Sequence, residues 1–161
     1  MSICHATSIE CWLRGGWAMD FFLASVTREH EDIDLFVWAK DASTLVRGLR
    51  GADFAELDEP SPEAQRDFSK DGEEVQAALL DRNQRGQVVV AGGPWAGSPW
   101  PDGMLNGSVG RIGELICPIV NPSVQVKINE RFREWRADLP VRDKHQADIA
   151  RLREALGCTG R

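Results

Sequence analysis

Apolar positions along the 161 residues follow both the two-residue period of strands and the wider period of amphipathic helices. The pattern predicts strands over 12–13, 33–38 and 53–57, a hairpin of 75–80 with 87–91, short strands over 110–112 and 115–119, and helices over 17–25, 42–48, 122–135 and 142–156. A polar loop with two prolines is expected between 57 and 75. This order predicts an α/β (α+β) fold in which a mixed β-sheet is flanked by helices and followed by two C-terminal helices.

Two aspartates, Asp32 and Asp34, open the apolar run that ends at residue 38. In a strand, residues two apart share a face, so these carboxylates point together while Ile33 and Leu35 point into a core. Neighbouring carboxylates repel each other unless a cation lies between them. Oxygen ligands suit Mg²⁺ or Mn²⁺, which completes its shell with water and substrate phosphates. A solvated strand end is the alternative interpretation of an isolated Asp-x-Asp.

A glycine pair, Gly15-Gly16, separates the first expected strand from the first expected helix. Glycine permits unusual backbone torsions and lets a ligand approach the main chain closely. Amides at the start of the following helix would face an anion, such as a phosphate. Taken alone, the glycines are also explained by an ordinary strand-to-helix turn. Together with the aspartate strand they indicate a site in which one element binds phosphate and the other binds the metal that bridges it.

The two motifs together resemble the signature of the small antibiotic nucleotidyltransferases, which are the aminoglycoside and lincosamide nucleotidyltransferases of the DNA polymerase beta-like superfamily. The matching residues are Gly15-Gly16-Trp17-Ala18-x-Asp20 and Val26-x-Arg28-x-His30-x-Asp32-Ile33-Asp34. The match is close over 12–36 and looser elsewhere, although 122–127 and 142–149 are similar to the C-terminal helices of the group. The resemblance implies one nucleotidyltransferase-like domain over 1–161, with a sheet-containing catalytic core over 1–120 and C-terminal helices over 121–161.

The resemblance also implies an activity, which is metal-dependent transfer of a nucleoside monophosphate to a hydroxyl of a small molecule. AMP is the expected transferred group, with ATP or another nucleoside triphosphate as the co-substrate. An aminoglycoside or lincosamide-type antibiotic is a candidate acceptor, and Mg²⁺ or Mn²⁺ is the expected cofactor. The metal ligands and catalytic residues would be Asp32, Asp34 and Asp81. The nucleotide would be contacted by Gly15, Gly16, Arg28, His30, Lys127 and Lys144.

Asp81 is chosen as the third carboxylate because it ends the apolar run 75–80, and the family places its third acid on a later strand in such a setting. Its role would be general base for the acceptor hydroxyl. Alternatively, Asp81 caps the turn that follows it. Glu73 and Glu74 are competing acids, but they lie in a segment that is polar for the centre of a sheet.

Charge and composition limit the partners. The net charge of −6 argues against a nucleic-acid-coating surface. An acidic segment over 53–74 could attract a cationic acceptor, and a basic segment over 127–153 could hold a triphosphate, although solvated faces explain most such residues. No stretch is long enough for a membrane span, and the four cysteines show no paired spacing, so a cytoplasmic protein with reduced thiols is expected. Its expected oligomeric state is a monomer or homodimer.

The glycine- and proline-rich stretch over 91–110 predicts a long loop that carries Trp95 and Trp100. The tryptophans would stack on an acceptor ring or pack beneath the loop. Two other functions remain open. One is a toxin–antitoxin-type nucleotidyltransferase that modifies a protein or RNA, and the other is a non-catalytic nucleotide-binding module of the same fold.

Overall fold

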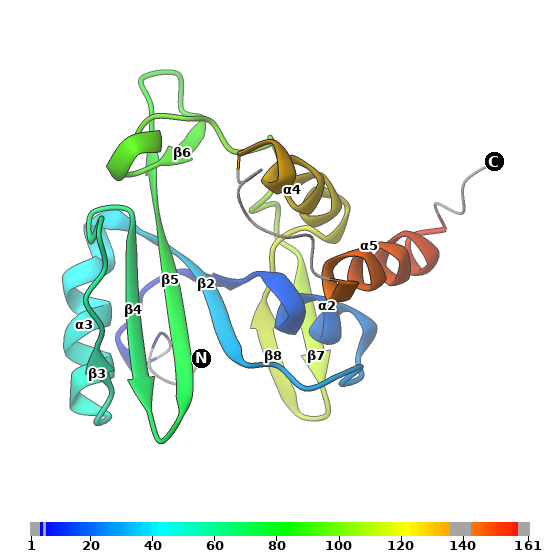
Figure 1. The fold of residues 1–161 in the computed structure, drawn as a ribbon, viewed down its shortest axis with the longest axis horizontal. Coiled ribbons are helices and arrows are strands. Elements are labelled where there is room, and N and C mark those ends of the chain that lie inside the picture. The colour runs from blue at the N-terminus through cyan, green and yellow to red at the C-terminus, as the bar shows by residue number, and fades with distance from the viewer. Residues whose placement is uncertain (1–3, 5, 136–142, 158–161) are drawn as a thin grey trace. The chain divides into compact units, whose positions relative to one another are not determined.

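The structure is a computed structural model that describes residue 4, residues 6–135 and residues 143–157, without the side chains of 131–135 and 143–145. The strands are β1 (Cys11–Leu13), β2 (Asp32–Trp38), β3 (Ala55–Glu56), β4 (Gln65–Lys70), β5 (Glu73–Arg82), β6 (Val88–Val90), β7 (Val109–Ile112) and β8 (Leu115–Pro118). The helices are α2 (Gly15–Leu23), α3 (Ala42–Gly51), α4 (Pro122–Trp135) and α5 (Asp143–Ala155), with short 3-10 turns at Ala39–Asp41 and Gly93–Trp95 (Figure 1). The expected mixed sheet, flanking helices and two C-terminal helices are confirmed.

The chain divides into two compact units that alternate along the sequence. The first comprises Met1–Leu13 and Arg28–Trp100, and the second comprises Arg14–Thr27 and Pro101–Arg161. The division expected at residue 120 stays a prediction. Among the described residues, no helix is long and apolar enough to cross a membrane.

The first unit is built on a sheet with the strand order β1-β2-β5-β4-β3, and β6 pairs with β5 (Figure 1). Strands β2 and β5 run parallel, and the other pairs are antiparallel. On one face of the sheet every second residue of β2 from Ile33 to Val37 and of β5 from Val75 to Leu79 is apolar. Val37, Ala77 and Phe68 of β4 lie on that face and have no exposed surface. Asp32 and Asp34 of β2 and Asp67 of β4 alternate with these residues and therefore lie on the opposite face.

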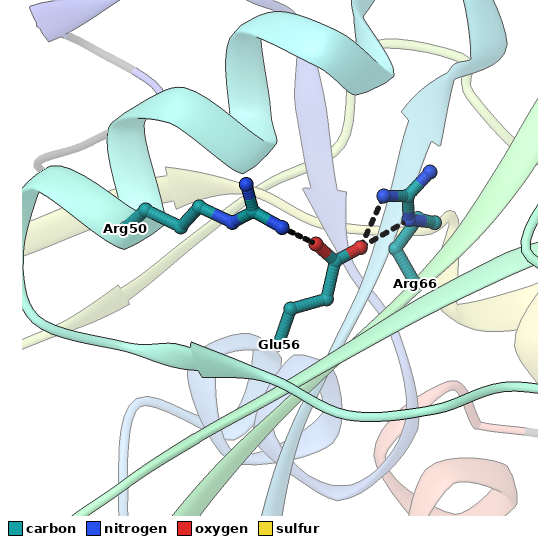
Figure 2. Close-up of polar contacts among 3 residues, drawn as sticks. All are labelled: Arg50, Glu56 and Arg66. Atoms are coloured by element: carbon teal, nitrogen blue, oxygen red, sulfur yellow. Dashed lines mark hydrogen bonds and ion pairs between the residues drawn. The ribbon is translucent and has the colours of Figure 1, made fainter.

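Helix α3 is tied to strands β3 and β4 by Glu56, whose side chain bridges two arginines (Figure 2). Arg50, in the last turn of α3, donates a hydrogen bond of 2.7 Å to Oε2 of Glu56, and Nε of Arg66 on β4 donates one of 2.6 Å to Oε1. A second bond joins Nη2 of Arg66 to Oε1. The polar loop expected before residue 75 therefore contains a strand, β4, whose charged side chains are paired.

The second unit packs α2 against the hairpin of β7 and β8 and against helices α4 and α5. Its core includes Met19 of α2, Val126 of α4 and Leu152 of α5, which are 1%, 8% and 0% exposed. Gly110 of β7 lies so close to α2 that an added Cβ atom would come within 2.8 Å of the Phe21 carbonyl carbon. Only glycine fits there without displacing the strand from the helix.

Candidate active site

Strand β2 begins with the aspartate pair and lies between β1 and β5. In the parallel register, Asp32 is the partner of Glu74 and Asp34 is the partner of Gln76. Partners on neighbouring strands project from the same face of a sheet, as do residues two apart on one strand. These four polar side chains therefore share one face at one end of the sheet, and all of them keep some exposure to solvent.

The row that contains Asp34 and Gln76 continues onto β4, where Asp67 is the antiparallel partner of Gln76. Asp67 is only 7% exposed. Its two carboxylate oxygens accept hydrogen bonds of 2.9 and 3.0 Å from Nε2 of Gln65, two residues earlier on the same strand. The amide holds this buried carboxylate in place, on the face that carries the aspartate pair.

Asp81 lies elsewhere on the sheet. It is at an odd position of β5, so it projects from the face opposite Gln76, and it is five residues further along the strand. At about 3.3 Å per residue this separation is roughly 17 Å, whereas two ions of a shared site lie about 4 Å apart. Its Oδ1 accepts a hydrogen bond of 2.7 Å from the backbone amide of Arg82. The register therefore does not bring Asp81 together with Asp32 and Asp34.

The face of the sheet that carries Asp32 and Asp34, here called the aspartate face, suits a divalent cation that arrives bound to the substrate. Within the described part of the chain, no group of three or more His, Cys, Asp or Glu side chains is arranged as a ready metal site. Mg²⁺ is commonly bound by one or two carboxylates together with waters and substrate phosphates, not by a cage made of protein alone. Asp32 and Asp34 are such a donor set, and Glu74 is the nearest further carboxylate in the register.

The same face continues into an aromatic cluster. Phe36, two residues after Asp34, meets the ring of Trp100 edge-on with 4.9 Å between centroids. Trp38 meets Trp12 in the same way at 5.8 Å, and the guanidinium of Arg82 lies 4.8 Å from the centre of a Trp38 ring. Trp100 is therefore a packing residue beside the aspartates, as one of the two sequence-based interpretations proposed.

Trp95 differs from Trp100 because it lies on the short 3-10 turn Gly93–Trp95 and is 55% exposed. The expected loop folds back along β6, where the amide of Trp100 donates to the carbonyl of Val88 at 2.9 Å. In the acidic segment 53–74, Glu56 is neutralised by its two arginines. The acids of this segment that are exposed are Asp53, Asp58, Glu63, Asp71, Glu73 and Glu74.

The glycine pair belongs to the second unit and starts helix α2. Gly15 has a φ of +67°, a conformation that strains any residue with a Cβ atom. Arg14, which precedes it, makes no side-chain hydrogen bond to cap the helix. The carbonyl of Gly15 accepts a hydrogen bond of 2.8 Å from Nε2 of Gln125 on α4. Sequence reasoning did not single out Gln125, because 110 residues separate it from its partner.

Asp20, the last residue of the glycine motif, is fully buried in α2. Its Oδ1 accepts a hydrogen bond of 2.6 Å from Oγ1 of Thr27, and its Oδ2 accepts one of 3.2 Å from the Thr27 amide. These bonds fix the segment that follows α2, where Ala24 takes the left-handed conformation with a φ of 56°. Asp20 is thus a structural residue of the motif.

The remaining expected nucleotide contacts are the side chains of Arg28, His30, Lys127 and Lys144. Arg28 and His30 precede β2 and are partly buried, and Nη1 of Arg28 donates to the carbonyl of Glu29 at 2.9 Å. Lys127 is exposed on α4. The side chain of Lys144 on α5 lies outside the described residues. The roles of these residues in nucleotide binding stay predictions.

Comparisons with known proteins identify the family and the fold of the chain. The family model described as aminoglycoside-2''-adenylyltransferase matches residues 1–152. The solution structure of the antibiotic-resistance factor ANT(2'')-Ia is similar with a TM-score of 0.77 and 16% identity, over 98% of this chain and 80% of that chain. Its complex with adenylyl-2''-tobramycin also gives 0.77 and 16%, over 98% and 85%.

The lincomycin-bound lincosamide antibiotic adenylyltransferase LnuA is similar with a TM-score of 0.75 and 16% identity, over 94% of this chain and 90% of that chain. At this identity the solved structures show a common fold. No curated protein sequence matches the chain. Because the family model spans nearly the whole sequence, residues 1–152, the chain belongs to the aminoglycoside-2''-adenylyltransferase family and is a nucleotidyltransferase.

Proposed function

We propose that this protein is a metal-dependent adenylyltransferase that moves AMP from ATP to a hydroxyl group of a small molecule, with aminoglycoside and lincosamide antibiotics as the first candidates. The observation that carries the proposal is the aspartate pair, which opens β2 on one face and has Glu74 and Gln76 beside it. Membership of the family supports the reaction class, and the fold shared with two antibiotic adenylyltransferases agrees with it.

Asp32 and Asp34 are the proposed ligands of Mg²⁺ or Mn²⁺. When bound, the cation supplies positive charge to the phosphates of the nucleotide, where negative charge accumulates as the reaction proceeds. Both carboxylates start a strand that pairs with β5 along its whole length, Asp32 with Glu74 and Asp34 with Gln76, so the backbone that carries them is held by β5. A rigid strand keeps the donor atoms in place before the substrate arrives, which lowers the cost of binding.

Glu74 is the proposed third carboxylate, in the role that the sequence suggested for Asp81. It is the partner of Asp32 on the neighbouring strand, shares its face and is exposed, so an acceptor hydroxyl can reach it. Glu74 would take the proton of the hydroxyl as that oxygen forms its bond to the α-phosphorus. The bond from the α-phosphorus to the bridging oxygen breaks at the same centre, and pyrophosphate leaves with the electron pair.

The nucleotide phosphates are proposed to bind at the Gly15-Gly16 turn, where α2 begins with uncapped backbone amides. Lys127 and Lys144 are proposed to neutralise the phosphate tail, and Arg28 and His30 are proposed to contact the phosphates. A cationic acceptor would be attracted by the exposed acids of the segment 53–74, and Trp95 offers an exposed ring for stacking.

The test is pyrophosphate release from ATP, GTP, CTP and UTP, each with and without Mg²⁺, against a panel of aminoglycosides, lincosamides and other polyols. Release that requires Mg²⁺, one nucleotide and one class of acceptor is the expected result, and mass spectrometry of the acceptor should show the added nucleoside monophosphate. Glu114→Gln, in the exposed turn between β7 and β8, is a matched control for the loss of one negative charge. The proposal fails if no nucleotide is consumed with any acceptor of the panel and no nucleotide binds with Mg²⁺.

A further inference from the structure

We infer that Gln125 is a positioning residue for the nucleotide, because it fixes the peptide unit between Gly15 and Gly16. This inference rests on the proposed function, in which the glycine turn binds phosphate. Gln125 lies on α4 and is 3% exposed, and both partners belong to the second compact unit. The bond of 2.8 Å from Nε2 to the Gly15 carbonyl is a contact between distant parts of the sequence, not part of the helix itself.

The chemistry of the bond settles the orientation of the side-chain amide. A backbone carbonyl can only accept, so the nitrogen of the Gln125 amide must face Gly15. The peptide unit is planar and trans, so its N–H points away from its C=O. By holding the carbonyl of Gly15, Gln125 therefore directs the amide of Gly16 toward the side of the turn opposite α4. A fixed N–H at the start of a helix is the kind of donor that binds a phosphate oxygen.

The turn depends on such outside support. Gly15 has a φ of +67°. Glycine has more accessible backbone conformations than any other residue, so fixing it in one of them costs more conformational entropy. Arg14 gives no side-chain cap to the helix. A flexible turn would have to be ordered each time the nucleotide bound, and that entropy would be lost from the affinity. The bond from Gln125 orders the turn in advance.

The start of α4 places Gln125 accurately. Asn121 caps the helix, since its carbonyl accepts from the amides of Val124 and Gln125 at 2.9 and 2.8 Å, and its Oδ1 accepts from Ser123 at 3.0 Å. Pro122 follows the cap as the first helical residue, where it needs no hydrogen-bond partner. The next residue after Gln125, Val126, packs in the core with Met19 of α2. The side chain thus reaches the glycine turn from a rigid helix end.

A purely structural role explains this glutamine poorly. Its Oε1 is buried and accepts no hydrogen bond from the described residues. A buried acceptor without a partner lowers stability, so an apolar side chain of the same length would suit the packing at least as well. What an apolar side chain cannot supply is the donor to Gly15.

The experiment compares Gln125→Met, which keeps the length of the side chain and removes the donor, with Gln146→Met on the exposed surface of α5. We expect Gln125→Met to raise the Kd for ATP with Mg²⁺ by about tenfold, the factor that one hydrogen bond of ordinary strength supplies. The Tm and the kcat at saturating ATP should stay close to those of the parent protein. Backbone hydrogen exchange of the peptide that contains the glycine turn should become faster, and Gln146→Met should change none of these quantities.

Gln125→Glu provides a second variant in which the donor can be restored by pH. When protonated, the introduced carboxyl group can donate to Gly15, whereas the carboxylate would repel the carbonyl. Measured against the parent protein, the Kd for ATP with Mg²⁺ should therefore be near normal at low pH and should rise with pH. Because ionisation of a buried carboxyl group also lowers stability, the Kd is compared only over the pH range in which the variant stays folded, where a destabilised fold alone would leave the Kd unchanged.

Equal Kd values and equal hydrogen exchange in Gln125→Met and the parent protein would overturn the inference and leave the proposed function standing. The same conclusion follows if both Gln125 variants lose Tm while their folded fraction binds ATP normally. A parent protein that binds no nucleotide with Mg²⁺ would overturn the inference together with the proposed function.

Discussion

Asp34 of β2 is paired in parallel register with Gln76 of β5, so the side chain next to the second aspartate is an amide and not a carboxylate. The nearest acids on the same face are Glu74, which is paired with Asp32, and Asp67, which is paired with Gln76 on its other side. This arrangement gives the aspartate pair a neighbour that can donate or accept a hydrogen bond without adding charge. It also defines which substitutions test the site.

Asp32→Asn and Asp34→Asn should each lower turnover by at least about 10²-fold, because each removes one of two charges that hold the cation, and cation stabilisation is worth several kcal/mol. Without metal, the Tm of either variant should equal or slightly exceed that of the parent protein, since repulsion within the pair is relieved. Pyrophosphate release and thermal unfolding measure the two effects. Near-normal turnover in either variant, with Glu114→Gln as the matched control, would remove the aspartate pair from the metal site.

Glu74→Gln and Asp81→Asn separate the two candidates for the third carboxylate. Glu74→Gln should lower kcat by about 10²–10⁴-fold, the range for losing a general base, and should change the KM for the nucleotide little. Asp81→Asn should keep most activity, because Asp81 lies on the other face of the sheet and well along β5. If Asp81→Asn inactivated the enzyme while Glu74→Gln turned over normally, the original sequence-based assignment would replace the one proposed here.

The aspartate strand and the hairpin after residue 73 could be predicted because their apolar residues alternate or run together. Strand β4 could not, because it reads Gln65-Arg66-Asp67-Phe68-Ser69-Lys70 and Phe68 is its single apolar residue. Its polar side chains have partners that the sequence does not reveal. Arg66 donates a hydrogen bond to Glu56, and Gln65 donates one to Asp67. A strand whose charges are neutralised in pairs has no hydrophobic signature.

The position of the third carboxylate is hard to predict from the sequence for a different reason. The local sequence around Asp81 fits a strand end, and β5 does run there. What decides the neighbour of the aspartates is the register of β2 against β5, two strands that are separated by α3, β3 and β4 in the chain. A shift of the register by one residue would exchange the faces of every side chain. Glu74 was a competing acid in the sequence, and only the register favours it.

Gln76→Asp should add a carboxylate directly beside Asp34 and so strengthen cation binding. We expect the Mg²⁺ concentration for half-maximal activity to fall by several-fold. This corresponds to an added attraction of somewhat less than about 1.4 kcal/mol, the free energy that changes a binding constant tenfold. In the absence of metal the Tm should fall, because three like charges are then close together. Gln76→Asn introduces a side chain of the same size as aspartate but without its charge, so it is the matched control for Gln76→Asp. A Mg²⁺ requirement that is equal in both variants would show that the cation does not lie near Gln76.

The pH dependence of stability should report on Cys117, which is 2% exposed in β8. Burial disfavours the thiolate and raises its pKa from 9.0 to about 11. Between these values the unfolded chain loses the thiol proton while the folded protein keeps it, so the free energy of unfolding falls as the pH rises. At about 1.4 kcal/mol per pKa unit, the loss is up to about 3 kcal/mol.

Chemical denaturation of the parent protein and of Cys117→Ala from pH 7 to 11 measures this contribution. The difference in unfolding free energy between the two proteins should be constant below pH 9 and should shrink above it, because only the parent protein loses the contribution of the protonated thiol. The region below pH 9 is an internal control for the cavity that the alanine leaves. A difference that stays constant to pH 11 would mean that Cys117 ionises equally well in the folded and unfolded protein.

The acceptor site is tested by the two tryptophans of the loop, which the structure places in different environments. Trp95 is 55% exposed, whereas Trp100 packs on Phe36 beside the aspartate face. Trp95→Ala should therefore leave the Tm unchanged and raise the acceptor KM if its ring stacks on the acceptor. Trp100→Ala should lower the stability by about 2–3 kcal/mol, near the lower end for large-to-small substitutions of aromatic residues, because Trp100 is only partly buried.

Salt distinguishes the chemical class of that acceptor. A polycationic acceptor attracted by the exposed acids of the segment 53–74 should bind more weakly as ionic strength rises, so its KM should increase several-fold between about 0.05 and 0.5 M salt. Glu63→Gln removes an exposed charge from the segment and should weaken this salt dependence. Glu56 makes a useful contrast, because Arg50 and Arg66 already neutralise it: Glu56→Gln should lower the Tm by loosening α3 and leave the salt dependence of KM unchanged. If a verified acceptor shows a KM that responds neither to salt nor to Trp95→Ala, its binding site lies away from both the acidic segment and the exposed ring.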